Sequence, residues 1–289
     1  MFDKINDYII YKKLDTGGFG DVYQCYLKEK ENKYYAIKLI KIDKDNSVNI
    51  LSEINLLKIL NSPYIPKLYE YFDFYKNNKK YIALVQEYIF GETLYDFIIK
   101  IKKNKVDIKL LIKLSYQMIT GLKQIHDIGI CHFDIKLTNI MINYNYDAVI
   151  IDLGLSCINN DLYNNINKCK NKQFVSGTPE YFSPELAQHA LIFSDTNFNC
   201  KKSDIWALGI VLYILFYQKD YLNIPSNYTT EQKCIYIMNT YYKDNYKVSI
   251  NKFPIIDNLL IKMLDINPLT RADINYCYKF IYNIYRNNK

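Results

Sequence analysis

The apolar residues change their spacing once along the chain, near residue 90, and this change limits the possible folds more than any other feature. Before that point, runs rich in Val, Ile, Tyr and Phe are separated by Gly, Lys and Asn, which predicts β-strands at 8–14, 21–27, 34–40, 68–74 and 81–88. One interval differs, because Ile50, Ile54 and Leu57 recur at helical spacing and predict a helix over 50–60. The first part of the chain is therefore expected to form a sheet with one main helix.

Beyond about Leu94 the spacing becomes helical. The pattern predicts a helix over 107–126 that stops before Gly129, and helices from Pro184 to the end of the chain. Short strands are expected around Ile142 and over 149–153, and the polar tract 159–172 is expected to be an exposed loop. Strands followed by helices predict an α+β protein with two packed lobes and a cleft between them.

The composition excludes some classes of protein. Hydrophobic residues make up 49% of the 289 residues, which is too many for a disordered chain. The net charge is +7, but the basic residues are scattered lysines, with only Arg271 and Arg286 as arginines. A nucleic-acid footprint needs basic residues gathered on one face, so no nucleic acid is expected as a partner.

The cysteines and the termini predict an intracellular protein in a reducing compartment, such as the cytoplasm of a cell or of a host cell. Seven dispersed cysteines without a CxxC pair argue against a disulfide framework and against a zinc site. The first ten residues lack the pattern of a signal peptide or a myristoylation site. The longest apolar run, 205–217, is shorter than the roughly 20 residues of a membrane span, so a buried helix is expected and no membrane.

Two features in the first part of the chain suit phosphate binding. The glycine-rich segment 14–22 lies between two predicted strands, where glycines let the backbone approach an anion, although a hairpin turn would look similar. Lys38 stands among apolar residues of the third predicted strand, which surface alternation would also explain. Glu53 on the following helix favours the functional interpretation, because an ion pair with Glu53 would hold the Lys38 ammonium toward phosphates.

The segment 131–141 gathers Asp134, Lys136 and Asn139 within six residues and between apolar neighbours. A buried carboxylate needs a partner, and here a cation and an amide are supplied locally. Asp152 follows a predicted strand and precedes a glycine. Because carboxylate and amide oxygens suit Mg²⁺, Asn139 and Asp152 are predicted as its ligands. His132 is better interpreted as a packed structural imidazole than as an acid or base.

These motifs in this order resemble the eukaryotic-type serine/threonine protein kinases, over about residues 8–286. Segments 177–185 and 204–209 resemble the end of the activation segment and the helix that anchors the catalytic loop. Arg271 falls where the family pairs an arginine with the glutamate found here as Glu185. Lys136 and Thr178 resemble serine/threonine kinases more than tyrosine kinases.

The resemblance implies a bilobal kinase fold within a single domain, 1–289. The N-lobe would cover about 1–88 with a small antiparallel sheet and one main helix, the hinge about 87–91, and the mostly helical C-lobe about 92–289. It also implies transfer of the γ-phosphoryl of ATP to a protein substrate, with ATP and Mg²⁺ as cofactors. A monomer is expected.

The resemblance assigns the site residues in three sets. The catalytic set would be Asp134, Lys136, Lys38 and Glu53. The metal ligands would be Asn139 and Asp152. The nucleotide-binding set would be Leu14, Asp15, Thr16, Gly17, Gly18, Phe19, Gly20, Asp21, Val22, Ala36, Lys38, Glu87, Ile89 and Met141. Gln86 would be the gatekeeper, and the hydrophobic spine would be Leu57, Leu68, His132 and Leu153.

Two residues depart from the family pattern. Asp15 stands where the first loop glycine is usual, which predicts weaker ATP binding and not its loss. Phe133 replaces the arginine that receives an activation-loop phosphate, so we expect activity without phosphorylation of Ser156 or Ser176. A pseudokinase scaffold is the main alternative, and a small-molecule kinase is a second one. The complete set of charged residues argues against the first, and a 34-residue segment from Asp152 to Glu185, suited to peptide docking, argues against the second.

Overall fold

The computed structural model describes residues 4–17, 20–42, 47–102, 106–158, 177–192, 199–243 and 249–288. The chain divides into two compact units. Unit 1 consists of Met1–Gly91 and Ile151–Gly154, and unit 2 of Glu92–Ile150 and Leu155–Lys289. The polar tract 159–172, which was expected to be a loop, lies outside the described residues.

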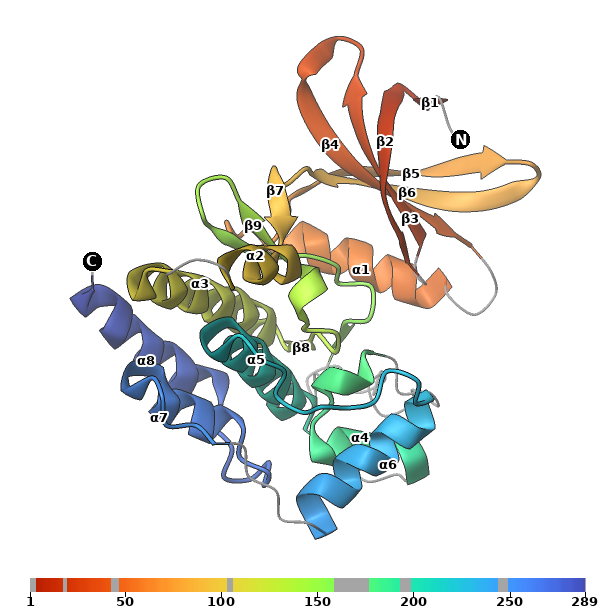
Figure 1. Cartoon of the computed structure of the whole chain (residues 1–289). Helices are drawn as coiled ribbons and strands as arrows, with labels where there is room; N and C mark the ends of the chain where they lie inside the picture. Colours follow the sequence, from red (N-terminus) through yellow and green to blue (C-terminus); the bar gives the residue numbers. More distant parts are fainter. Residues whose placement is uncertain are drawn as a thin grey trace. The chain divides into compact units, whose positions relative to one another are not determined.

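Unit 1 is an antiparallel sheet of six strands with one helix (Figure 1). The strand order is β1-β2-β3-β4-β6-β5. The bounds are β1 Lys4–Ile5, β2 Tyr8–Gly17, β3 Gly20–Leu27, β4 Lys30–Lys41, α1 Ser47–Ile59, β5 Leu68–Lys76 and β6 Lys79–Glu87. Every strand predicted for this part of the chain is confirmed, and so is the helix over 50–60.

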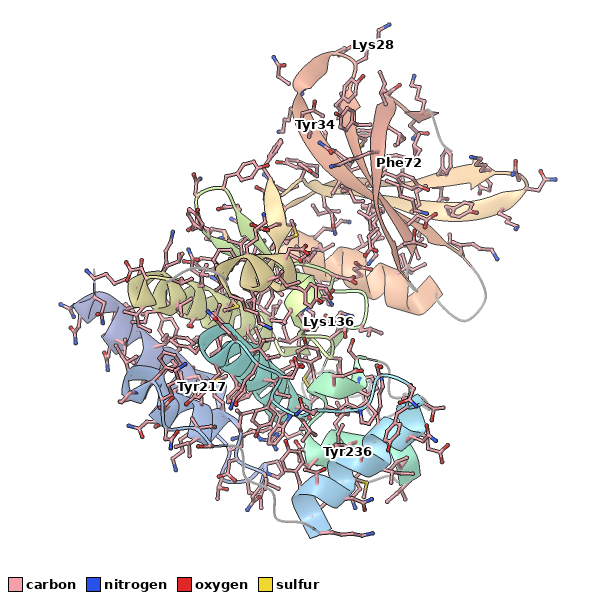
Figure 2. The ribbon with its side chains drawn as sticks, viewed as in Figure 1. Lys28, Tyr34, Phe72, Lys136, Tyr217 and Tyr236 are labelled. Carbon is pink, nitrogen blue, oxygen red and sulfur yellow. A yellow bond between two sulfur atoms is a disulfide. The ribbon has the colours of Figure 1, made fainter. Side chains whose placement is uncertain are left out.

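The two faces of this sheet are packed differently. Ile37, Leu39, Ala83 and Val85 belong to one apolar cluster, which also includes the aromatic rings of β2 and β3. Phe72, labelled on β5 in Figure 2, packs against the same cluster. Successive residues of a strand point to opposite faces, so residue 38 faces the other side of the sheet.

That other side holds helix α1. Ile40 and Leu84 of the sheet form a second cluster with Ile50 and Ile54 of α1. Both sequence patterns, alternation on β4 and helical spacing on α1, therefore place Lys38 on the face that carries the helix. This arrangement positions the charged residues of the site described below.

Unit 2 is built around helix α5, Cys200–Tyr217, in which 15 of 18 residues are buried (Figure 1). This confirms the buried helix expected over 205–217. No helix in the described part of the chain is long and apolar enough to cross a membrane. The other α-helices are α2 Leu94–Ile101, α3 Ile108–Asp127, α4 Pro184–Ile192, α6 Thr230–Met238, α7 Pro254–Met263 and α8 Ile274–Asn287.

Short elements of the chain complete the fold. Strands β7 Gly91–Thr93, β9 Ile140–Asn143 and β10 Ala148–Ile150 form one small sheet, and β8 Ile130–Cys131 pairs with β11 Cys157–Ile158. The remaining turns of helix are η1 Leu137–Asn139, η2 Pro179–Tyr181 and η3 Asn239–Lys243.

Two residues with positive φ angles follow the ends of elements of unit 2. Gly129 has a φ of 78°, which explains why α3 stops just before it. The strand expected over 149–153 ends at Ile150, because Asp152 has a φ of 64° in the left-handed region and cannot continue a strand.

The structure contains a disulfide, although the cysteine spacing argued against a disulfide framework. Cys131 and Cys200 form a disulfide between β8 and the first residue of α5. Dispersed spacing could not reveal this pair, because 69 positions separate the two residues in the sequence. Cys25, Cys234 and Cys277 are free and buried.

Candidate active site

The charged cluster of unit 1 is centred on the Lys38 ammonium. Lys38 Nζ lies 2.7 Å from Glu53 Oε1 and 2.7 Å from Asp152 Oδ1. Lys38 and Glu53 are both buried, at 6% and 3% exposure. The ion pair predicted between Lys38 and Glu53 is therefore present, and Asp152 joins it.

Burial and charge act in opposite directions on this cluster. Burial lowers the pKa of Lys38, but the carboxylates of Glu53 and Asp152 outweigh it and raise the pKa above its ordinary value. Burial raises the pKa of Glu53, against the attraction of Lys38. We take the lysine as charged, because two carboxylates share this single ammonium. The position of the Lys38 ammonium is thus fixed by one ion pair with Glu53 and one with Asp152.

Asp152 is held in place by its backbone and by the glycine two residues later. The left-handed φ of Asp152 turns the chain at the end of β10, and Asp152 Oδ1 accepts a hydrogen bond from Gly154 N at 3.1 Å. A Cβ on residue 154 would lie 3.0 Å from Asp152 Oδ1 and 3.1 Å from Lys38 Nζ. The glycine therefore leaves the space that the charged groups use.

The glycine-rich loop joins β2 to β3, as the sequence predicts. Gly20 has a φ of 133°, and a Cβ there would lie 2.2 Å from Leu39 O, so only glycine fits. Asp15 Oδ1 accepts from Thr16 N, and Asp21 forms an ion pair with Lys13 at 2.7 Å. Gly18 and Phe19 lie outside the described residues.

The other nucleotide-binding candidates of unit 1 lie on its strands. Val22 pairs with Asp15 and Lys38 across β3, and Ala36 pairs with Gln24 and Gln86 across β4. Glu87 ends β6, and its N–H donates to Lys67 O at 2.8 Å. The remaining members are Leu14, Thr16 and Gly17 on β2, Gly20 and Asp21 on β3, and Ile89 after β6.

The catalytic loop of unit 2 centres on the buried Asp134 carboxylate. Lys136 Nζ lies 2.7 Å from Asp134 Oδ2, and Asn139 Nδ2 donates to the same oxygen at 2.8 Å. Asn139 Nδ2 also donates to Asp134 O at 2.9 Å. Lys136 lies in the loop before η1 (Figure 2). The three residues that the sequence gathers within six positions are thus joined directly.

Thr178 is a member of this network that the sequence analysis did not assign to the site. Its Oγ1 donates to Asp134 Oδ1 at 2.9 Å and accepts from Lys136 Nζ at 3.0 Å. Thr178 had served only as a marker of serine/threonine kinases. Its distance of 44 positions from Asp134 hides the contact from any local pattern.

A second carboxylate, Asp204 on α5, fixes the backbone of the catalytic loop. Asp204 accepts from His132 N at 2.7 Å and from Phe133 N at 2.9 Å, and His126 Nε2 lies 2.9 Å from Asp204 Oδ2. Phe133 has a φ of 66°, so these bonds hold a left-handed residue just before Asp134. The sequence analysis did not identify His126 as a partner of Asp204.

The remaining residues singled out from the sequence lie in apolar surroundings. His132 is completely buried, and its Nδ1 accepts from Asp134 N at 3.2 Å, which fits the structural interpretation of this ring. Leu57 and Leu153 are buried in unit 1, and Leu68 packs beside the α1 cluster. Met141 lies on β9.

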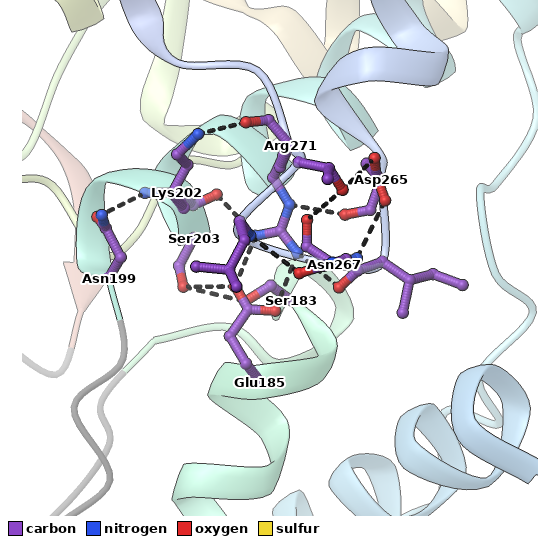
Figure 3. A network of polar contacts seen from close by, with 11 residues as sticks. Ser183, Glu185, Asn199, Lys202, Ser203, Asp265, Asn267 and Arg271 are labelled. Atoms are coloured by element: carbon purple, nitrogen blue, oxygen red, sulfur yellow. Dashed lines mark hydrogen bonds and ion pairs between the residues drawn. The ribbon is translucent and has the colours of Figure 1, made fainter.

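Arg271 anchors the helices of unit 2 around Glu185 (Figure 3). Its two terminal nitrogens donate to the two Glu185 oxygens at 2.5 and 2.9 Å. The other donors reach the backbone oxygens of Asp265, Ile266 and Lys202. Arg271 is 1% exposed, and its guanidinium carbon Cζ lies 5.0 Å from the centroid of the Trp206 ring. The pair predicted from the sequence is confirmed, and it uses every donor of the guanidinium.

The sheet of unit 1, the helices of unit 2 and these two charged networks define a protein kinase fold. The family model described as the protein kinase domain matches residues 8–282. The chain therefore belongs to the protein kinase domain family.

Several protein kinases are similar in sequence to this chain. One is the fatty acyl-CoA synthetase and RNA processing-associated kinase 1 of Saccharomyces cerevisiae, at 34% identity over 72% of this chain and 24% of that protein. The serine/threonine-protein kinase KIN4 of the same yeast is 32% identical over 72% of this chain and 25% of its own length. The human NUAK family SNF1-like kinase 1 is 31% identical over 73% and 29%. The chain thus spans about a quarter of the length of these relatives.

Proposed function

We propose that this chain is an ATP-dependent serine/threonine protein kinase that transfers the γ-phosphoryl group of ATP to a hydroxyl of a protein substrate. The observation that carries the proposal is the buried Asp134 carboxylate, which receives contacts from Lys136, Asn139 and Thr178. Membership of the kinase family and similarity to named serine/threonine kinases support it.

The catalytic loop supplies groups for both ends of the transfer. Asp134 is a carboxylate that accepts the proton of the substrate hydroxyl or orients that hydroxyl. The Lys136 ammonium is beside it and stabilises negative charge on the transferred phosphoryl group. The two contacts of the amide of Asn139 and the backbone bonds to Asp204 keep Asp134 in one position, which is the main requirement for this reaction.

Unit 1 supplies the lysine for the α and β phosphates. Lys38 carries the charge for this role, and Glu53 and Asp152 determine where its ammonium lies. The glycine-rich loop between β2 and β3 adds backbone N–H groups that suit phosphate oxygens. We assign Glu87, Ile89, Val22, Ala36 and Met141 to the adenine, as the resemblance implies.

Magnesium is part of the proposal, with Asn139 and Asp152 as its ligands. The donor set fits, because Mg²⁺ binds oxygen and these residues offer an amide oxygen and a carboxylate. Asn139 directs its Nδ2 to Asp134, which leaves the amide oxygen as the atom available to a cation. When bound, Mg²⁺ neutralises phosphate charge and aligns the nucleotide.

We also propose that activity does not depend on activation-loop phosphorylation. Phe133 has no cationic group, and the described residues that line the cavity beside it include Asp134 and Asp204 but no lysine or arginine. A phosphate there would meet carboxylates that repel it and no cation to pair with. The test is Ser156→Ala with Ser176→Ala in phosphatase-treated protein. Turnover within about twofold of the parent chain is expected, and a drop of tenfold or more would contradict this part of the proposal.

The whole function is tested by transfer of radiolabelled phosphate from ATP to peptides containing serine or threonine. Asp134→Asn keeps the shape of the side chain and removes its charge, and we expect at least a hundredfold loss of kcat. Asp147→Asn, a carboxylate away from the catalytic loop, is the matched control. Nucleotide binding without any transfer by the parent chain would favour the pseudokinase alternative.

A further inference from the structure

The first turn of α5 attaches five consecutive residues to other segments of unit 2. The five attachments are the disulfide from Cys200 to Cys131, Lys201 Nζ to His126 O, Lys202 Nζ to Arg271 O, Ser203 Oγ with Ser183 Oγ, and Asp204 to the N–H groups of His132 and Phe133. Lys202 and Ser203 appear in Figure 3. Of these attachments, only the disulfide is covalent and can be made or broken by a change in redox conditions.

The disulfide and the Asp204 carboxylate hold the same segment, from the end of β8 into the loop that follows it. Cys200 and Asp204 are four residues apart on α5 and so lie on one face of the helix. Their partners are neighbours in the sequence, because Cys131 directly precedes His132 and Phe133. The covalent bond is therefore placed one helical turn from the hydrogen bonds that set the backbone before Asp134.

We propose that Cys131 and Cys200 are a redox modification site, whose disulfide tethers the catalytic loop to α5 and whose reduction loosens that loop. The two Cα atoms are 5.8 Å apart, within the range of ordinary disulfides. Both residues are buried, at 0% and 2% exposure, so exchange with a soluble thiol or disulfide takes place when this part of the chain opens locally. In a reducing compartment, which the sequence predicts, such a bond is formed transiently and acts as a signal.

The chemistry is thiol–disulfide exchange with glutathione disulfide as the oxidant. The thiolate of one cysteine attacks a sulfur of glutathione disulfide, which gives a mixed disulfide and releases one glutathione thiolate. The thiolate of the second cysteine then attacks the protein sulfur of the mixed disulfide and displaces the second glutathione. The two protons lost by the protein thiols are taken up by the two glutathione thiolates, so one disulfide is reduced as one is formed.

The other described cysteines are suited to remain unmodified. Burial raises the pKa of the Cys234 thiol to about 11 and that of the Cys277 thiol to about 12, and it raises the pKa of Cys25 to about 12 as well. What distinguishes these three thiols from the equally buried Cys131 and Cys200 is that they are free, with no disulfide partner among the described residues to complete the exchange. Cys157 is the alternative partner that the test must distinguish from Cys200, because its backbone lies opposite Cys131 in the pairing of β11 with β8.

The bond itself is tested by equilibrating the purified chain in buffers of increasing ratio of glutathione disulfide to glutathione. Free thiols are then trapped by alkylation and the cysteines are assigned by peptide mapping. We expect Cys131 joined to Cys200. A map in which Cys131 pairs with Cys157, or in which Cys131 and Cys200 stay alkylated at every ratio, would overturn the proposal.

The effect on the loop is tested by hydrogen exchange of the His132 and Phe133 amides in the oxidised and the reduced chain. These amides donate to Asp204, so their protection reports how firmly the loop is held. We expect exchange roughly tenfold faster after reduction, and a melting temperature lower by roughly 5–15 °C. Equal hydrogen-exchange rates in the oxidised and the reduced chain would contradict the proposal that the disulfide tethers the catalytic loop.

Activity supplies a further readout, which rests on the proposed kinase function. We expect reduction to lower kcat by roughly threefold to tenfold, less than the roughly hundredfold cost of a misplaced group, since the bonds to Asp204 remain. Cys131→Ala with Cys200→Ala should behave like the reduced chain at every glutathione ratio, whereas Cys234→Ala should respond like the parent chain. A redox response that persists in the double variant would contradict the assignment. A chain without phosphoryl transfer in either state, but with the difference in hydrogen exchange, would contradict the kinase function and support the tether.

Discussion

At the scale of single residues, the structure distinguishes arginine from lysine. The chain uses lysine for nearly all its basic positions, yet the residue buried against Glu185 is an arginine. A planar guanidinium can bind both carboxylate oxygens and still donate to three backbone carbonyls, which a single ammonium cannot do. The choice of residue type at position 271 is therefore a consequence of geometry and not of charge.

This argument predicts a graded loss of stability at Arg271. Arg271→Lys keeps the charge but leaves buried carbonyls without donors, so we expect a loss of about 2 kcal/mol in the free energy of unfolding. Arg271→Met also leaves the Glu185 carboxylate unpaired, and we expect about 3–5 kcal/mol. Denaturant unfolding measures both. An Arg271→Lys variant as stable as the parent chain would show that the guanidinium geometry contributes nothing.

Gly154 supports a second prediction at this scale, on nucleotide affinity. The added Cβ of Gly154→Ala would lie within 3.1 Å of both Asp152 Oδ1 and Lys38 Nζ, and these two charged groups would have to move by a few tenths of an ångström. We expect the Kd for ATP with Mg²⁺ to rise about tenfold, as measured by calorimetry, which corresponds to about 1.4 kcal/mol. An unchanged Kd would mean that Lys38 and Asp152 do not bind the nucleotide together.

At the scale of secondary-structure elements, the sequence was most informative where periodicity and motif agree. Strand alternation on β4 and helical spacing on α1 were enough to bring Lys38 and Glu53 together, because both patterns specify a face. The end of β10 at Ile150 could not be predicted, since apolar residues continue to Leu153 and only the backbone of Asp152 stops the strand.

Contacts between distant elements account for what the sequence did not reveal. Thr178 reaches Asp134 across 44 positions, and Cys131 meets Cys200 across 69. His126 lies at the end of α3 and contacts Asp204 on α5. None of the three carries a local pattern, because each contact joins segments that are far apart in the sequence. The motif residues themselves were predictable, since short spacing brings them together within one loop.

Asp147 connects two elements of unit 2 and gives a prediction about pH. Its Oδ1 accepts from Gln117 Nε2 at 2.6 Å and from Lys113 Nζ at 2.9 Å, which joins the start of β10 to α3. Burial works to raise the pKa of Asp147, but the Lys113 and Gln117 contacts outweigh it and lower the pKa below its ordinary value. The ionised form is therefore favoured by folding.

A lowered pKa contributes stability that is present above about pH 4 and is lost as the pH falls through the value in the folded state. We expect Asp147→Asn to lose up to about 1 kcal/mol at pH 7, a modest amount because the side chain is 34% exposed. The difference between variant and parent should disappear toward pH 2. Urea unfolding at several pH values measures it, and a difference that is constant with pH would contradict the assigned contacts.

At the scale of the whole molecule, each unit has its own apolar core and its own charged network. Lys38, Glu53 and Asp152 belong to unit 1, whereas Asp134 and Asn139 belong to unit 2. The proposed reaction assigns nucleotide and metal binding to residues of both units. Because a ligand that binds only the folded state stabilises it, such binding can be observed in the melting of the whole chain.

We therefore expect a nonhydrolysable ATP analogue with Mg²⁺, at about 100 times its Kd, to stabilise the chain by about 2.7 kcal/mol. For a chain of this size that corresponds to a rise in melting temperature of roughly 5–10 °C. Asp152→Asn should abolish most of the part of the rise that depends on Mg²⁺, because it removes the charge of a proposed metal ligand. Asp147→Asn is the matched control and should keep the full rise, since the proposal assigns Asp147 to neither the nucleotide nor the metal. Differential scanning fluorimetry measures the melting temperature in each case. A rise in melting temperature that is equal with and without Mg²⁺, or that is unchanged in Asp152→Asn, would contradict the assignment of Asp152 as a metal ligand.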